Sequence, residues 1–88
     1  MAKDVKFQHR DRFIELGVTI AAYRKLKGYS QQELADRAGI SRSHLSSIEA
    51  QNIVRPFSLE VLFNLADALD VAPETLLSPR FGAAFRNE

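Results

Sequence analysis

The sequence predicts an all-α domain of five short helices, and three observations support this fold class. Apolar residues recur at intervals of three and four along most of the chain, as they do on the buried face of a helix. Ser30, Ser41 and Ser58 each precede such a segment, where a serine hydroxyl can accept hydrogen bonds from the first amides of a helix. Glycine, aspartate or proline separates the segments, and no segment has the pattern of a strand.

The composition indicates one small domain with an ordinary surface. The chain has 88 residues, of which 45% are hydrophobic and 26% charged. It has no cysteine, which excludes disulfides and thiolate metal sites. The apolar runs are too short to span a bilayer, and the N-terminus lacks the apolar region of a secretory signal. We therefore expect a cytoplasmic protein without a cofactor or a membrane contact.

The net charge of +1 conceals an uneven distribution of charge along the chain. Residues 1–29 contain seven Lys and Arg against three acidic residues, residues 30–55 three of each, and residues 56–88 two against five. The first third can therefore face a polyanion, whereas the acidic end cannot. A solvated basic helix explains the same charge pattern equally well.

The first helix is expected from Phe13 to Leu26, because the apolar residues at 13, 16, 20 and 23 fall on one face. Gly28 follows and suits the left-handed conformation that commonly ends a helix. Residues 1–10 precede the helix and are interpreted as an N-terminal arm.

The second and third helices are expected at 31–38 and 42–50. Ser30 and Glu33 fit a capping box, in which the serine accepts from first-turn amides and the glutamate bonds back to the cap. Gly39 ends the second helix, and Ser41 caps the third. The inward-facing residues are Leu34, Ala35 and Ala38 on the second helix, and Leu45 and Ile48 on the third.

The last two helices follow a loop at 51–57 that contains Pro56. The fourth helix starts after Ser58, and Asp70 can end it because aspartate tolerates left-handed geometry. Its broad apolar face contains Leu59, Leu62, Phe63, Leu65, Ala66 and Leu69. Pro73 opens a short fifth helix, which Pro79 ends.

Two short helices joined by a tight turn at Gly39 form the arrangement of a helix-turn-helix, whose second helix enters the DNA major groove. The motifs around this turn are Ile20-x-x-Tyr23-Arg24, Gly28-Tyr29-Ser30-Gln31-x-Glu33-Leu34-Ala35, Ala38-Gly39-Ile40-Ser41, Leu45-x-x-Ile48-Glu49, Ser58-Leu59-Glu60-x-Leu62 and Leu65-Ala66-x-Ala68-Leu69. With these motifs the sequence resembles the repressor/Cro-type (XRE-like) helix-turn-helix proteins of phages and bacteria. The resemblance implies a compact five-helix domain over residues 11–79 that binds double-stranded DNA.

The outward side of helix 42–50 carries small polar side chains and one arginine. The residues on this side are Arg42, Ser43, Ser46 and Ser47, with His44 on the flank. Small side chains let a helix approach base edges in a major groove about 12 Å wide. A solvent-exposed, serine-rich helix is the alternative interpretation.

Arg42 is the strongest candidate for base reading, because arginine can bond guanine O6 and N7 together; a phosphate contact is its alternative. The resemblance implies base contacts for Ser43 and Ser47. Ser46 is a weaker candidate for a base contact, and His44 either reaches a base or a phosphate or only flanks the helix.

Phosphate contacts are expected from residues that flank this helix. The resemblance implies that Gln31 bonds a phosphate and braces the recognition helix, although an ordinary exposed glutamine is the alternative. Ser41 can act as both cap and phosphate donor. Asn52 and Arg55 lie in the loop with which the family grips the DNA backbone, and Arg55 can equally be a solvated cation.

The resemblance also implies a partly buried ion pair between Arg24 and Glu49, which joins the first and third helices. Such a pair mainly sets geometry, and removal of one partner is costly.

The sequence departs from the family at three places. Gln51 stands where a glycine usually follows the recognition helix, and Ala72 replaces the usual polar cap before Pro73. The loop that follows Gln51, residues 52–57, is longer and more apolar than usual. Its Ile53, Val54 and Phe57 must cover either the core or a partner chain, which weakens the case for phosphate contacts from this loop.

A sequence-specific transcriptional regulator, in particular a repressor, is the predicted function. Proteins of this class usually bind near-palindromic sites as homodimers, with half-sites about 34 Å apart. Candidate dimer contacts are Leu76, Leu77, Phe81 and Phe85, the last two in the tail 80–88. A flexible tail without a dimer contact is the alternative. The basic arm 1–10 either touches phosphates or stays solvated. An antitoxin or other interaction module, with a toxin or another protein as its main partner, is the alternative; no constellation indicates an enzyme.

Overall fold

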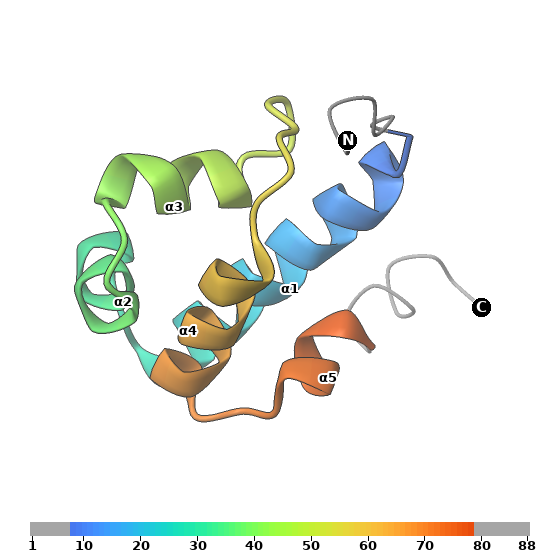
Figure 1. The fold of residues 1–88 in the computed structure, drawn as a ribbon. Helices are drawn as coiled ribbons and strands as arrows, with labels where there is room; N and C mark the ends of the chain where they lie inside the picture. Colours follow the sequence, from blue (N-terminus) through green and yellow to red (C-terminus); the bar gives the residue numbers. More distant parts are fainter. Residues whose placement is uncertain (1–7, 79–88) are drawn as a thin grey trace.

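The computed structural model describes residues 8–78, and five helices account for most of this range (Figure 1). They are α1 (Arg10–Lys27), α2 (Gln31–Ala38), α3 (Arg42–Glu49), α4 (Leu59–Leu69) and α5 (Pro73–Leu77). The predicted all-α, five-helix domain is confirmed. α1 begins at Arg10 rather than at Phe13, so that Arg10 belongs to the helix and not to the N-terminal arm.

Six of the helix ends are set by capping residues that the sequence predicted. Ser30, Ser41 and Ser58 each accept a hydrogen bond from a first-turn amide, and Ser30 and Glu33 form the complete capping box. At the other ends Gly28, Gly39 and Asp70 adopt left-handed conformations with φ of 77°, 72° and 59°. These helix ends were predicted from the glycine or aspartate alone, because such residues favour the left-handed conformation that ends a helix.

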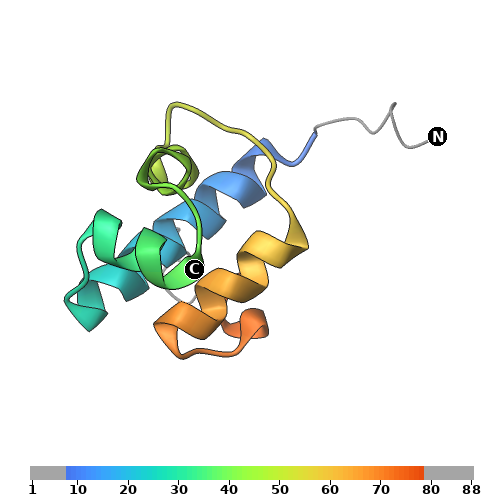
Figure 2. The same cartoon turned by 60° about the vertical axis from the view of Figure 1, so that its left-hand side comes forward.

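The core collects a buried stripe from every helix. α2 packs against α3 and α4, whereas α1 contacts α3, α4 and α5. α3 is seen nearly end-on in Figure 2 while α1 lies across the view, which shows that α3 crosses α1 instead of running alongside it. The buried apolar residues are Ile20, Leu34, Ala35, Ala38, Leu45, Ile48, Leu62, Leu65, Ala66, Leu69 and Leu76.

The loop between α3 and α4 divides its apolar residues between core and solvent. The Phe57 ring packs against the core and meets the Phe13 ring edge to face, with 5.7 Å between the ring centroids. Val54 is half-buried, but 46% of Ile53 is exposed. Of the two alternatives for this loop, the core or a partner chain, Phe57 therefore covers the core.

Two departures from the family have a simple structural basis. α3 ends with Glu49, and the backbone of the cap residue Ala50 is extended with φ of −73° and ψ of 131°, so the chain leaves the helix without a left-handed residue. Within residues 8–78 Asp70 is the only non-glycine residue with positive φ, and Gln51 is therefore unstrained at its position. At α5 the cap residue Ala72 makes no side-chain hydrogen bond, and Pro73 at the helix start supplies the local preference instead.

No helix in the described part of the chain combines the length and apolar character needed to cross a bilayer.

Candidate nucleic-acid interface

The turn between α2 and α3 holds the two helices in a defined orientation. The backbone N–H of Gly39 donates to the Asp36 carbonyl at 3.3 Å, and the N–H of Ile40 donates to the Ala35 carbonyl at 3.0 Å. The half-buried Ile40 side chain packs against the core. Because the turn is hydrogen-bonded and anchored, the direction of α3 follows from that of α2.

α3 presents opposite faces to the core and to solvent. Leu45 is fully buried and Ile48 is 8% exposed, whereas Arg42 and Ser43 are exposed at the start of the helix. His44, Ser46 and Ser47 are half-buried. The first turn of α3 is therefore its most accessible part, and Arg42 stands there.

The serines that cap α3 and lie in its second half have different surroundings. The Ser41 hydroxyl accepts from the His44 N–H at 2.9 Å, which leaves its own O–H available as a donor. Ser47 lines a narrow crevice that also contains Ile53 and Arg55 of the following loop. Ser46 instead lines an open groove of about 530 Å³ between α3 and α1. Ser46 and Ser47 thus lie towards opposite flanks of α3.

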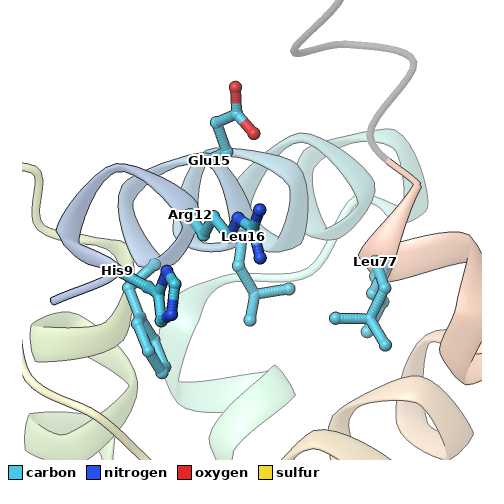
Figure 3. Close-up of a pocket in the computed structure, with 7 residues that line it drawn as sticks. His9, Arg12, Glu15, Leu16 and Leu77 are labelled. Atoms are coloured by element: carbon cyan, nitrogen blue, oxygen red, sulfur yellow. The ribbon is translucent and has the colours of Figure 1, made fainter. Parts of the chain in front are cut away.

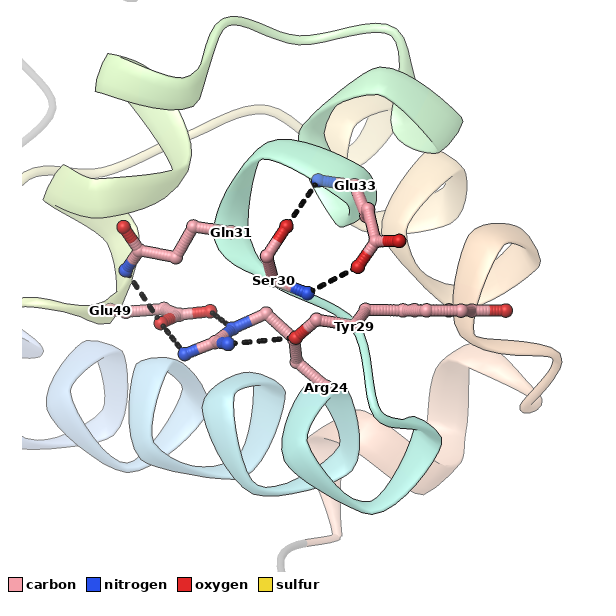
Figure 4. A network of polar contacts seen from close by, with 6 residues as sticks. All are labelled: Arg24, Tyr29, Ser30, Gln31, Glu33 and Glu49. Atoms are coloured by element: carbon pink, nitrogen blue, oxygen red, sulfur yellow. Dashed lines mark hydrogen bonds and ion pairs between the residues drawn. The ribbon is translucent and has the colours of Figure 1, made fainter.

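Arg24 and Glu49 form the ion pair that the resemblance implied. Nε of Arg24 donates to Oε2 of Glu49 at 2.8 Å, and Nη2 donates to Oε1 at 2.9 Å, so the contact is bidentate. The two side chains are only 12% and 6% exposed. The remaining Nη1 donates to the Tyr29 carbonyl at 2.9 Å, so that one guanidinium links α1, the turn before α2 and the end of α3 (Figure 4).

Gln31 belongs to the same network. Its Nε2 donates to Oε1 of Glu49 at 2.9 Å, as Figure 4 shows. The resemblance implies a phosphate contact and bracing of the recognition helix for Gln31, but it does not indicate this partner. The two residues are 18 positions apart and meet only when α2 and α3 fold against each other. The amide keeps a second N–H and its oxygen for other contacts.

Asn52 and Arg55 are both exposed in the loop after α3. Arg55 lies beside the crevice that Ser47 lines, so its charge is close to the C-terminal half of α3.

Gly17 and Thr19 are structurally important residues that sequence reasoning missed. A Cβ atom on Gly17 would overlap the carbonyl oxygen of Ile48 and lie 3.3 Å from its carbonyl carbon, so the backbones of α1 and α3 touch at this point. The buried Thr19 hydroxyl donates to the Glu15 carbonyl at 2.8 Å and is satisfied within α1. The available signal for Gly17 was a glycine in the middle of a helical pattern, which often marks a close backbone approach.

The candidate dimer contacts separate into three groups. Leu76 is fully buried in the core of the domain, so it is not accessible to a partner chain, and the prediction that it contributes a dimer contact is wrong. Leu77 is 58% exposed and borders a groove between α1 and α5 (Figure 3). Phe81 and Phe85, with the rest of the tail 80–88, lie outside the described residues, as does most of the arm 1–10.

Known proteins share both the sequence pattern and the fold. Residues 20–76 match the helix-turn-helix protein family. The HTH-type transcriptional regulators SinR of Bacillus licheniformis and Bacillus subtilis are 45% identical over 65 residues, which is 74% of this chain. The chain spans only 58% of the length of these relatives.

Solved structures agree. SinR in complex with DNA is 46% identical, with a TM-score of 0.66 over 72% of this chain and 98% of that chain. The SinR protein/SinI protein complex is 38% identical, with a TM-score of 0.67 over 82% of this chain and 76% of that chain. The restriction-modification controller protein C.AhdI of Aeromonas hydrophila is 33% identical, with a TM-score of 0.70 over 75% of this chain and 97% of that chain.

The capped helices, the anchored turn and the polar outward face of α3 thus accompany a sequence and a fold that both match helix-turn-helix proteins. The chain belongs to the XRE-type helix-turn-helix family of DNA-binding domains.

Proposed function

We propose that the chain is a transcriptional regulator that binds a specific double-stranded DNA site by placing α3 in the major groove. The observation that carries this proposal is the exposed start of α3, with Arg42 and Ser43. The turn before α3 and the ion pair at its end hold the helix at a defined angle. The relative SinR, solved in complex with DNA, supports it.

In this proposal the outward residues of α3 read bases and the flanking residues grip phosphates. Arg42 bonds guanine in the first accessible turn, and Ser43, Ser46, Ser47 and His44 supply weaker base contacts. Phosphate contacts come from Gln31, Ser41, Asn52 and Arg55.

The regulator acts as a homodimer and as a repressor. One eight-residue recognition helix offers few base contacts, whereas two copies on a near-palindromic site double them, with half-sites about 34 Å apart. The exposed Leu77 and the tail 80–88 are the proposed dimer contacts.

Selection of bound DNA from a random library tests this function directly. We expect an enriched near-palindromic site, bound with an affinity that falls steeply as salt concentration rises. Each variant is then titrated against the selected site and against random DNA. Arg42→Ala is expected to lose discrimination at one base position per half-site, by about 1–3 kcal/mol.

Arg12→Ala is the matched control, because it removes the same charge from the groove between α1 and α5 (Figure 3), away from α3. Equal losses on the selected and the random DNA for Arg42→Ala would refute its role in base reading. Failure to enrich any sequence would refute the proposed function.

A protein partner is the second candidate, and the structure of SinR with SinI favours it. In that case this chain works as an interaction module, for example as the antitoxin of a toxin. A purification that yields a stoichiometric protein partner and no enriched DNA would support this interpretation over the first.

A further inference from the structure

Glu49 is the acceptor on which three parts of the domain converge. Its carboxylate is 6% exposed and accepts from two nitrogens of Arg24 and from Nε2 of Gln31. Oε1 is shared, because it receives both Nη2 of Arg24 and the Gln31 amide, each at 2.9 Å. A single side chain at the last residue of α3 therefore reaches α1 and the first residue of α2 (Figure 4).

The bond to Glu49 restricts the side chain of Gln31. A glutamine at the first position of a helix ordinarily samples several rotamers, and ordering it costs side-chain entropy on binding. Here one amide hydrogen is already engaged, so the remaining N–H has a restricted direction in the free protein. A phosphate oxygen can only accept, and this second N–H is what the amide has left to donate.

The charges of the network suit the same task. A carboxylate alone beside a DNA phosphate would repel it, but the guanidinium of Arg24 engages both carboxylate oxygens. The pair is neutral as a unit, so Glu49 can hold the amide without a net negative charge at the place where the phosphate must come.

We infer that Glu49 is a positioning residue for DNA binding: it holds the Gln31 amide ready for a backbone phosphate and thereby links the phosphate grip at the start of α2 to the end of the reading helix. This inference rests on the proposed function. Glu49 itself touches no DNA in this arrangement. It acts on DNA through Gln31, beside its separate task of tying the end of α3 to Arg24.

A double-mutant cycle tests the coupling. Affinities of the full chain for the selected site and for random DNA are measured for Gln31→Ala, Glu49→Gln and the double variant, well below their melting temperatures. The glutamine introduced by Glu49→Gln keeps the size of the side chain but offers one acceptor oxygen in place of two. We expect each single variant to weaken binding to both DNAs by about tenfold. The double variant is expected to lose about tenfold as well, rather than about a hundredfold.

Gln32→Ala is the matched control. Gln32 is the next residue of α2, and its Nε2 also donates to a carboxylate at 2.9 Å, that of Asp36 within the same helix. Its removal should leave the affinity unchanged in both the wild-type and the Glu49→Gln backgrounds. Multiplicative losses for Gln31→Ala and Glu49→Gln would overturn the inference, since two independent effects multiply.

A second measurement uses the wild-type protein, so it remains possible even if the Glu49→Gln variant does not fold. Side-chain amide resonances of the free and DNA-bound wild-type protein report the mobility of each glutamine. The Gln31 amide should be rigid in both states, whereas the amide of the exposed Gln51 should be mobile in the free protein. A Gln31 amide as mobile as that of Gln51 would overturn the inference even where specific DNA binding is intact, which separates its failure from failure of the proposed function.

Discussion

Replacing Gly17 by alanine perturbs the closest approach between α1 and α3. The new Cβ would overlap the Ile48 carbonyl oxygen and lie 3.5 Å from the Cα of Glu49. These neighbours are backbone atoms of α3, which cannot rotate away as a side chain can. The helix must instead shift away from α1, and the pairing of Arg24 with Glu49 must shift with it.

The magnitude follows from two opposing terms. Overpacking costs about 1–3 kcal/mol, and backbone neighbours place this site at about 3 kcal/mol. Alanine in place of glycine inside a helix recovers about 1 kcal/mol. The free energy of unfolding should therefore fall by about 2 kcal/mol, which for a domain of this size lowers Tm by roughly 8–16 °C.

Thermal and urea denaturation followed by circular dichroism measure this loss, and DNA titration at low temperature measures the displacement of α3. Gly28→Ala is the comparison: its Cβ would meet nothing within 4 Å, and its cost of about 1–2 kcal/mol comes only from φ of 77°. DNA affinity should drop for Gly17→Ala and stay near wild type for Gly28→Ala while both are folded. An unchanged or higher Tm for Gly17→Ala would refute the close contact.

Three further predictions concern other parts of the domain. Arg55→Ala should weaken binding to all sequences alike and make the dependence of log affinity on log salt shallower by about one unit, whereas loss at one base position only would contradict a phosphate role. Ser41→Ala should lower the free energy of unfolding by about 1 kcal/mol in urea denaturation, because the His44 amide loses its acceptor, while the exposed Ser43→Ala should change it little. Leu76→Ala should cost about 2–5 kcal/mol by the same measurement and Leu77→Ala less than about 0.5 kcal/mol; equal losses would contradict their different burial.

Local signals in the sequence were sufficient for most helix ends, but not for the start of α1, where no side chain caps the helix. The box formed by Ser30 and Glu33, and the helix ends at Gly28 and Asp70, act through contacts within a few residues, so the pattern predicts them without knowledge of the fold. The order of the helices and most of their buried faces followed from apolar spacing, since a 3.6-residue period assigns each residue to one side. Leu59 and Phe63 are the exceptions: they were expected on the apolar face of α4, but they are 65% and 44% exposed.

Contacts between distant helices were harder to predict. The spacing of Leu76 and Leu77 does not say which of two adjacent leucines enters the core, and the packing of α5 on α1 and α4 decides it. The bond between Gln31 and Glu49 and the touch of Gly17 on Ile48 likewise depend on the crossing of helices. The pair of Arg24 and Glu49 was expected only through the resemblance to a family, because no pattern along a single helix indicates it.

The stability of α3 and the base reading that we propose for it reside in different residues. An isolated helix of eight residues is only marginally stable in water, and α3 buries only Leu45 and Ile48. Three contacts therefore stabilise it: Ser41 caps its start, Gly17 lets its backbone lie against α1, and Glu49 ties its last turn to Arg24. None of these is among the outward residues that we propose to read bases. Arg42 and Ser43 are exposed and take no part in this bracing, so their substitution should change which DNA is bound at little cost in stability. Substitution of a bracing residue should instead weaken binding to every sequence, because it moves the whole helix relative to the groove.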